Sequence, residues 1–224
     1  MSLADVLAQT RHVLLDFDGP MCATFSAISA ADATRQLGEH LGHYGVQVPA
    51  YLLEAADPFA LLYYVAATAP HLHSTAEARL TELEVAGVKS AQPTPGLRPL
   101  LDALARTGRT VTVVSNNSAA AVKAFTKAEE LSHYFHSIVA RTDPDPSLLK
   151  PDPHLLLQAA ANLEALPATC TLLGDSVTDV EAAHRAGTRS IAFANRPDKR
   201  NALVAAHPGA IISSLLDVVT ALPA

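Results

Sequence analysis

The sequence is short of the features that mark secreted, membrane-spanning and nucleic-acid-binding proteins. Its two cysteines, Cys22 and Cys170, form neither a metal-site nor a redox motif, as expected in a reducing cytoplasm. It has no cluster of lysine and arginine, so the charge pattern indicates no nucleic-acid partner and no anionic membrane surface. No uncharged apolar run reaches the roughly 18 residues of a membrane span, and residues 1–5 lack the features of a signal peptide. We therefore expect a cytoplasmic protein that binds neither nucleic acid nor membrane.

The composition that remains is typical of a folded globular protein. With 224 residues, of which 49% are hydrophobic and 17% charged, the chain can bury a sizeable core and a smaller accessory unit. Its 16 basic and 22 acidic residues give a net charge of -6. This acidity does not exclude an anionic substrate, because a bound divalent cation reverses the local field.

A short apolar run near the N-terminus ends in two carboxylates. The sequence HVLLDFDGP begins at His12, and its apolar part predicts a buried parallel strand that ends at Asp16. In an open α/β sheet, ligands bind beyond the carboxyl ends of the strands, so Asp16 is placed for chemistry. Asp16 and Asp18 must share a small volume, which is costly unless a cation lies between them or one carboxyl is protonated. Taken alone, the stretch fits equally well with a strand-end turn in which Asp-Gly supplies only turn chemistry.

The segment from Gly19 to Pro93 is predicted to be helical, without a strand. Helices are expected over residues 25–43, 59–67 and 74–85. Asp57 supplies an N-cap before Pro58 for the second helix, and residues 74–77 (STAE) form a capping box for the third. A helical insertion therefore follows the first strand directly.

After Pro93 the pattern changes to alternating strands and helices. Strands are expected over residues 110–115, 137–140, 169–173, 190–194 and 210–212, and helices over residues 97–106, 119–130 and 177–186, up to residue 163 and after residue 213. Alternation of this kind implies a parallel sheet with right-handed crossovers.

Polar residues follow four of the predicted strands. They are Asp16 and Asp18, Ser115 and Asn116, Lys150, and Asp175 and Asp179. Because the carboxyl ends of parallel strands share one edge of the sheet, we expect these side chains to converge. Taken separately, Asp175 and Asp179 could be acidic residues that the dipole favours at a helix start. Because these polar residues come from four separate loops, we interpret them as one functional site rather than as unrelated turns.

The ordered motifs resemble those of the haloacid dehalogenase (HAD) superfamily. They are DFDG from Asp16, SNN from Ser115, KP at Lys150, and GDS ending in Ser176 with a further aspartate at Asp179. The resemblance implies an α/β fold with a Rossmann-like three-layer core around a parallel sheet, formed by residues 1–20 and 93–224. It also implies that residues 21–92 form a small α-helical cap domain of the C1 type, inserted after the first strand.

Asp16 and Asp18 have the chemistry for phosphoryl transfer through a covalent intermediate. An anionic phosphate ester repels an aspartate nucleophile unless a cation cancels the repulsion, and Mg²⁺ suits a site with few carboxylates and several waters. We expect Asp16 to attack phosphorus and form an aspartyl-phosphate, while Asp18 protonates the leaving oxygen and then activates water. By the resemblance, the metal ligands are Asp16, the backbone carbonyl of Asp18 and Asp175, and Asp179 orients metal-bound water.

Three further residues are expected to bind the phosphoryl group. Ser115 would supply a hydroxyl, Asn116 a backbone N–H and Lys150 a positive charge. Ser115 and Asn116 could instead cap the following helix, and a lone lysine is usually a solvated charge. We interpret Asn117 and Ser118 as capping residues.

Asp18 points to the phosphatase branch of the superfamily. Resemblance to the dehalogenase branch would imply no aspartate two residues after the nucleophile, and phosphonate hydrolysis in the family uses a cap lysine, whereas the first lysine here is Lys89. The resemblance thus implies a phosphoglycolate-phosphatase-like, Mg²⁺-dependent phosphomonoester hydrolase for a small phosphorylated metabolite. A phosphomutase, a phospho-acceptor module and a non-catalytic protein that kept the fold are the alternatives. Pro20 departs from the family, whose members often carry Thr or Val there.

The predicted cap is poor in basic residues. We assign neither Arg35 nor Arg79 to the substrate. The aromatic residues Phe59, Tyr63 and Tyr64 are expected to pack in the core of the cap, with a platform for the substrate as the alternative. The apolar content of the cap is compatible with a monomer or a homodimer.

Overall fold

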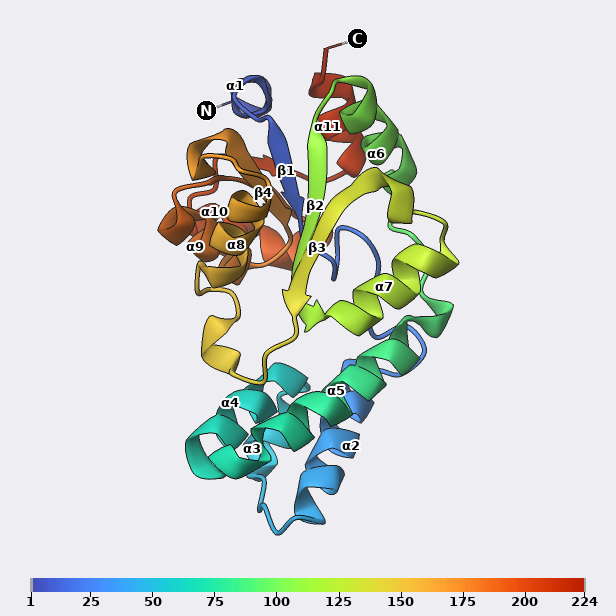
Figure 1. Cartoon of the computed structure of the whole chain (residues 1–224), viewed down its shortest axis with the longest axis vertical. Coiled ribbons are helices and arrows are strands. Elements are labelled where there is room, and N and C mark those ends of the chain that lie inside the picture. The colour runs from blue at the N-terminus through green and yellow to red at the C-terminus, as the bar shows by residue number, and fades with distance from the viewer. Residues whose placement is uncertain (1, 224) are drawn as a thin grey trace.

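The protein is built on a sheet of six parallel strands (Figure 1). A computed structural model describes residues 2–223 of the chain. The strands are β1 (His12–Leu15), β2 (Thr110–Ser118), β3 (Phe135–Arg141), β4 (Cys170–Gly174), β5 (Arg189–Phe193) and β6 (Ala210–Ile212). They lie in the order β3–β2–β1–β4–β5–β6, and every neighbouring pair is parallel. The predicted α/β fold with a parallel sheet is confirmed.

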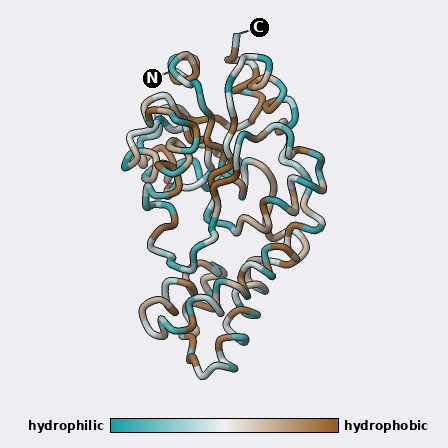
Figure 2. Tube along the Cα trace, viewed as in Figure 1, coloured by the Kyte–Doolittle hydropathy of each residue, from teal (hydrophilic) through white to brown (hydrophobic). Residues whose placement is uncertain are grey.

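Helices cover both faces of the sheet and complete three layers. One face packs against α1 (Leu3–Ala8), α6 (Leu97–Arg106), α7 (Ala119–Ala128) and α11 (Leu215–Ala221), and the other against α8 (His154–Asn162) and α9 (Val177–Ala186). Val13 and Leu15 belong to the first hydrophobic cluster and Leu14 to the second, because successive strand side chains point to opposite faces. A strand buried on both faces must be apolar throughout, and Figure 2 shows hydrophobic residues concentrated along the central strands.

Four helices between β1 and β2 form a separate bundle beyond the carboxyl ends of the strands (Figure 1). They are α2 (Ala30–Gly42), α3 (Ala50–Glu54), α4 (Pro58–Thr68) and α5 (His73–Gly87). The bundle has a hydrophobic cluster of its own, which includes Leu37, Leu61 and Leu80. On this basis we propose that residues 21–92 are a cap domain and residues 1–20 and 93–224 the core domain.

The limits of two cap helices differ from the sequence prediction. α2 begins at Ala30 rather than near residue 25, because Ser29 is its N-cap and accepts a hydrogen bond from the Asp32 N–H. The capping box predicted at Ser74 is wrong. A 3₁₀ turn (Pro70–Leu72) leads directly into α5, so Ser74 already lies inside the helix and caps nothing.

Three short helices were not predicted from the sequence. They are α1 and α10 (Arg200–Ala205), of six residues each, and α3, of five. So few residues carry little helical periodicity, and packing stabilises these helices instead: Val6 and Leu7 of α1 and Leu203 of α10 are buried, and Leu52 and Leu53 of α3 pack against the cap cluster.

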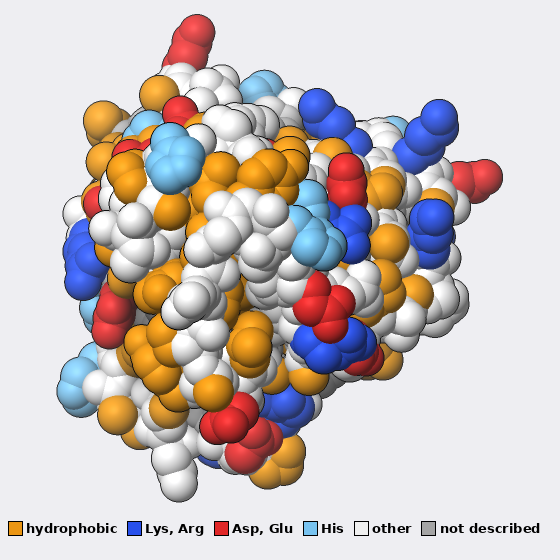
Figure 3. Space-filling model, turned by 90° about the horizontal axis from the view of Figure 1, so that it is seen from below, with side chains coloured by type: hydrophobic (Ala, Val, Ile, Leu, Met, Phe, Trp, Pro, Cys, Tyr) orange, Lys and Arg blue, Asp and Glu red, His pale blue; other side chains and the backbone are white. Residues whose placement is uncertain are grey.

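The surface of the cap carries exposed aromatic side chains. Tyr44, Tyr51 and Tyr63 are all exposed. Figure 3 views the molecule from the cap end and shows hydrophobic side chains gathered over part of that surface. Within residues 2–223, no helix has the length and apolar character that a bilayer span requires.

Candidate active site

Three aspartates meet at the carboxyl end of the sheet. Asp16 follows β1, Asp175 follows β4, and Asp179 lies in the first turn of α9. β1 and β4 are paired with Leu15 opposite Leu173, so the two strands end side by side. The three side chains are buried, and one oxygen of each lies within 4.8 Å of the others. The structure thus brings together residues that lie about 160 positions apart in sequence.

Two glycines allow the carboxylates to approach so closely. A Cβ atom at Gly19 would lie 2.2 Å from Oδ2 of Asp175, and Gly19 also has a φ of +98°. A Cβ atom at Gly174 would lie 2.4 Å from Cγ of Asp179. Any larger residue at either position would push a carboxylate out of the cluster.

Lys150 is the cation at the centre of this cluster. Its Nζ lies 2.7 Å from Oδ1 of Asp16 and 2.6 Å from Oδ1 of Asp179, and the side chain is buried. Burial alone would lower the pKa of Lys150, but the two carboxylates outweigh it and raise that pKa. Burial and the nearby Asp179 raise the pKa of Asp16 well above its usual value, and Lys150 offsets this only in part.

A second lysine approaches the cluster from the loop after β5. Lys199, in the 3₁₀ turn Pro197–Lys199, forms an ion pair with Oδ2 of Asp175, and Asn195 donates to the same oxygen over 2.8 Å. Burial raises the pKa of Asp175, whereas Lys199 lowers it. Sequence analysis did not identify Lys199 or Asn195, because neither belongs to a recognisable motif.

The donor set fits a hard divalent cation such as Mg²⁺. Three buried carboxylates face two lysines, so the cluster keeps an excess of negative charge, and carboxylate oxygens are the ligands that Mg²⁺ prefers. Asp16, Asp175 and Asp179 could therefore hold a metal ion.

We expect the Lys199→Met variant to bind Mg²⁺ about tenfold more tightly than the wild type. Lys199 places a positive charge on Asp175, which both competes for a ligand oxygen and repels the ion. Isothermal titration calorimetry measures the affinity directly, and Lys123→Met on the surface of α7 is the matched control. Unchanged or weaker binding by Lys199→Met would contradict this role.

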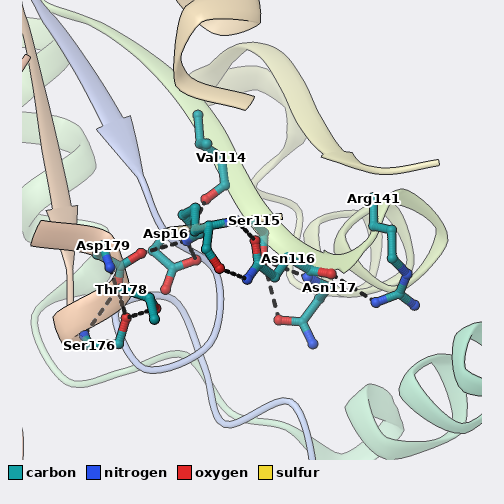
Figure 4. Close-up of polar contacts among 10 residues, drawn as sticks. Asp16, Val114, Ser115, Asn116, Asn117, Arg141, Ser176, Thr178 and Asp179 are labelled. Atoms are coloured by element: carbon teal, nitrogen blue, oxygen red, sulfur yellow. Dashed lines mark hydrogen bonds and ion pairs between the residues drawn. The ribbon is translucent and has the colours of Figure 1, made fainter. Parts of the chain in front are cut away.

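The last residues of β2, from Ser115 to Ser118, form the third side of the site (Figure 4). The Ser115 hydroxyl donates to Oδ1 of Asn117 over 3.2 Å and accepts from the Asn117 N–H over 3.1 Å. The Asn116 side chain donates to the Lys150 carbonyl and accepts from the Lys150 N–H, which fixes the backbone that carries the lysine. Ser118 caps α7 as predicted, by accepting from the Ala121 N–H. The prediction of Asn117 as a cap is wrong, because its amide is buried and donates elsewhere.

A buried ion pair connects this end of β2 to the cap. Glu84 of α5 accepts from the Asn117 amide over 3.1 Å and from the Ser118 N–H over 2.9 Å. Both Glu84 oxygens also pair with Arg141 at the end of β3, at 2.8 and 3.1 Å. Arg141 in turn donates to the Asn116 carbonyl over 2.8 Å. A cap helix therefore fixes the conformation of the end of β2, which lines the site.

We expect Glu84→Gln to lower the free energy of unfolding by about 2 kcal/mol, because the amide leaves the buried Arg141 with a weaker partner. Chemical denaturation gives this value. Glu82→Gln, on the same helix but with its side chain 67% exposed, is the control and is expected to change stability little. Equal effects of the two substitutions would contradict a structural role for the buried pair.

A cavity of about 160 Å³ opens beside these groups. Its lining includes the predicted residues Asp16, Asp18, Ser115, Asn116, Lys150 and Asp175, together with Phe59, Asn117, Ser176 and Thr178. Asp179 lies behind the lining, where it contacts Lys150. The Asp18 side chain is exposed and accepts from the Thr24 N–H over 2.8 Å.

The cap aromatics lie only partly where the sequence predicted. Phe59 packs against the hydrophobic cluster of the cap as predicted and also lines the cavity, whereas Tyr63 is 43% exposed, so the prediction is wrong for Tyr63. Tyr64 is half-buried, and its hydroxyl donates to the Gln47 carbonyl over 2.8 Å. Aromatic identity alone does not tell which face of a helix meets the core.

A family model described as haloacid dehalogenase-like hydrolase matches residues 13–193 of the chain. A bifunctional riboflavin kinase/FMN phosphatase of Arabidopsis thaliana is 33% identical over 55% of this chain and 32% of its own length. A phosphoglycolate phosphatase of Nitrosospira multiformis is 39% identical over 42% of this chain and 40% of its own. The alignments thus span less than half of the length of these two curated relatives.

Solved structures show the same fold over nearly the whole chain. A haloacid dehalogenase-like family protein from Streptococcus pneumoniae superposes with a TM-score of 0.71 at 18% identity, over 95% of this chain and 98% of that one. CbbY from Rhodobacter sphaeroides, solved in complex with phosphate, has a TM-score of 0.65 at 18% identity, over 95% and 99% of the two chains.

Proposed function

Because the chain belongs to the haloacid dehalogenase-like hydrolases, we propose that it is a Mg²⁺-dependent phosphomonoester hydrolase acting on a small phosphorylated metabolite. The observation that carries the proposal is the cluster of Asp16, Asp175 and Asp179 around Lys150, at a cavity that also presents Ser115. The similarity to proteins named phosphoglycolate phosphatase supports this activity. The cavity is smaller than the roughly 300 Å³ of typical drug-sized pockets, which supports a small substrate.

Each residue has a role in this proposal. Asp16 is the nucleophile, and Lys150 holds its Oδ1 and so fixes the direction of attack. The bond from Asp16 to phosphorus forms as the bond to the leaving oxygen breaks, and Asp18 gives that oxygen a proton. Asp18 then takes a proton from the water that hydrolyses the aspartyl-phosphate. Ser115 and the Asn116 N–H bind phosphoryl oxygens, and Lys150 offsets their charge.

The metal belongs beside these groups. Asp16, Asp175 and the backbone carbonyl of Asp18 would hold Mg²⁺, with Asp179 supporting them through Lys150 and the Ser176 hydroxyl. When bound, Mg²⁺ would supply the positive charge that allows a carboxylate to approach a phosphate ester.

The cap and the cysteines support two further parts of the proposal, the control of access to the site and the cellular location. A cap tied to the core through Glu84 and Arg141 would shield the site from water and select the leaving group. Cys22 and Cys170 are buried and unpaired, which supports a reducing cytoplasmic location.

The test is phosphate release from a panel of phosphorylated metabolites in Mg²⁺ and in EDTA. We expect release in Mg²⁺ that EDTA abolishes and that added Mg²⁺ restores. Release that continues in EDTA would contradict the metal dependence, and no release across the panel would contradict the hydrolase.

A further inference from the structure

Among the described residues, the cap presents one aromatic side chain and no cation to the cavity. Phe59, at the start of α4, is the cap residue that lines it. Tyr63 lies one helical turn further, so both rings share a face of α4, and this helix packs against the turn Pro146–Leu148 of the core. Among the described residues that line the cavity, Lys150 is the one cationic side chain, and Asp16 and Asp179 already hold its ammonium group.

The guanidinium of Arg141, which lies over Phe59, is occupied as well. The Arg141 guanidinium lies 5.7 Å from the centre of the Phe59 ring, a cation–π contact that helps to fix the ring. Its N–H groups are bound by Glu84, Glu77 and the Asn116 carbonyl, and its side chain is 1% exposed. Arg141 therefore supports Phe59 from behind and has no free face for a substrate carboxylate.

The surroundings of Tyr63 are acidic. Burial and the nearby carboxylates of Asp57, Asp152 and Asp145 raise the pKa of Tyr63. Asp57 comes from the cap, whereas the other two come from the core loop that precedes α8. His73 lies near Asp145 and offsets part of this charge when protonated. These carboxylates would repel a second negative group on the substrate, and, among the described residues that line the cavity, no cationic side chain is placed there to pair with it.

We infer that the substrate is a phosphomonoester whose leaving group is uncharged and has a flat, apolar part that packs on Phe59 beside Tyr63. This inference rests on the proposed hydrolase function and specifies its substrate class. Esters whose leaving group carries a carboxylate, as in phosphoglycolate, are poor substrates, because nothing at the cap side of the cavity compensates that charge. The chain then differs in specificity from the relatives named phosphoglycolate phosphatase.

A matched pair of substrates tests the inference. Benzyl phosphate and 4-carboxybenzyl phosphate have leaving alcohols of similar acidity and differ by one remote carboxylate. We expect kcat/KM of the wild type in Mg²⁺ to be at least about tenfold higher for benzyl phosphate. Tyr63→Lys, which places a cation at this exposed position, is expected to narrow the difference by raising kcat/KM for the carboxylated ester.

Variants of Phe59 test the contact itself. The ratio of kcat/KM for benzyl phosphate to that for methyl phosphate is expected to fall about tenfold in Phe59→Ala. Phe59→Leu keeps an apolar side chain between α4 and Arg141. We therefore expect the ratio of kcat/KM for benzyl phosphate to that for methyl phosphate to fall less in Phe59→Leu than in Phe59→Ala.

Equal rates on the two benzyl esters, or a preference for the carboxylated one, would overturn the inference and leave the hydrolase intact. An unchanged benzyl-to-methyl ratio in Phe59→Ala would do the same. No Mg²⁺-dependent release from any ester by the wild type would overturn the proposed function itself, and the inference with it.

Discussion

The Asp16→Asn variant is expected to lose phosphate release by a factor of at least about 10⁴. The amide keeps the shape of the side chain but cannot attack phosphorus. Steady-state phosphate release with the best substrate of the panel measures the loss. Retained activity would contradict the covalent mechanism.

The same variant is expected to be more stable than the wild type in EDTA, by about 1 kcal/mol. In the metal-free cluster, burial and the nearby Asp179 raise the pKa of Asp16 and so disfavour its charged form. The amide removes that charge and keeps the volume. Thermal and chemical unfolding in EDTA measure the change, and Asp198→Asn, with its side chain 68% exposed, is the control. A variant that is both inactive and less stable would indicate a structural role for Asp16 instead.

The Lys150→Met variant is expected to lose both stability and activity. Methionine fills a similar volume but leaves Asp16 and Asp179 buried without their shared cation, which costs about 3–5 kcal/mol. Activity is expected to fall at least about 10³-fold, because the nucleophile loses its orientation and the phosphoryl group loses a positive charge.

Mg²⁺ provides a further check on Lys150→Met. Because a dication neutralises the same carboxylates, we expect Mg²⁺ to raise the unfolding temperature of this variant more than that of the wild type. Lys123→Met, at an exposed position of α7, is the control and is expected to change neither property. Stability within about 0.5 kcal/mol of the wild type would contradict the role of Lys150 as the central cation.

The fold and the convergence of the motifs could be predicted because local patterns determine both. The apolar run before Asp16 is long enough for one buried strand, and the β-branched run from Thr110 to Ser115 is typical of another. Once the strands are parallel, chain topology alone brings the loops after β1, β2 and β4 to one edge of the sheet. Asp16 and Asp175 meet there for that reason, despite their separation in sequence.

Contacts between unrelated segments could not be predicted in this way. Glu84 reads as an ordinary charged residue of a helix, and its pairing with Arg141 depends on how the cap packs on the core. Lys199 contacts Asp175 only because β5 lies next to β4. Tyr63 was assigned to the wrong environment, because the sequence does not say which face of α4 meets the core loop.

The predicted capping box at Ser74 was wrong for a different reason. A capping box has a sequence signature, but the signature is satisfied only where the chain enters the helix from an extended residue. Here Pro70 begins a 3₁₀ turn that runs directly into α5, so the helix has already started at His73. The tertiary path of the chain therefore overrides the local signal.

The measurement that tests the central claim most directly is chemical trapping of the phosphorylated enzyme. Borohydride reduces an aspartyl-phosphate to homoserine, and mass spectrometry of the digested protein identifies the residue. During turnover in Mg²⁺, we expect homoserine at position 16, and none in EDTA or without substrate. Reduction at another aspartate, or none during sustained phosphate release, would contradict the assignment of Asp16 as the nucleophile.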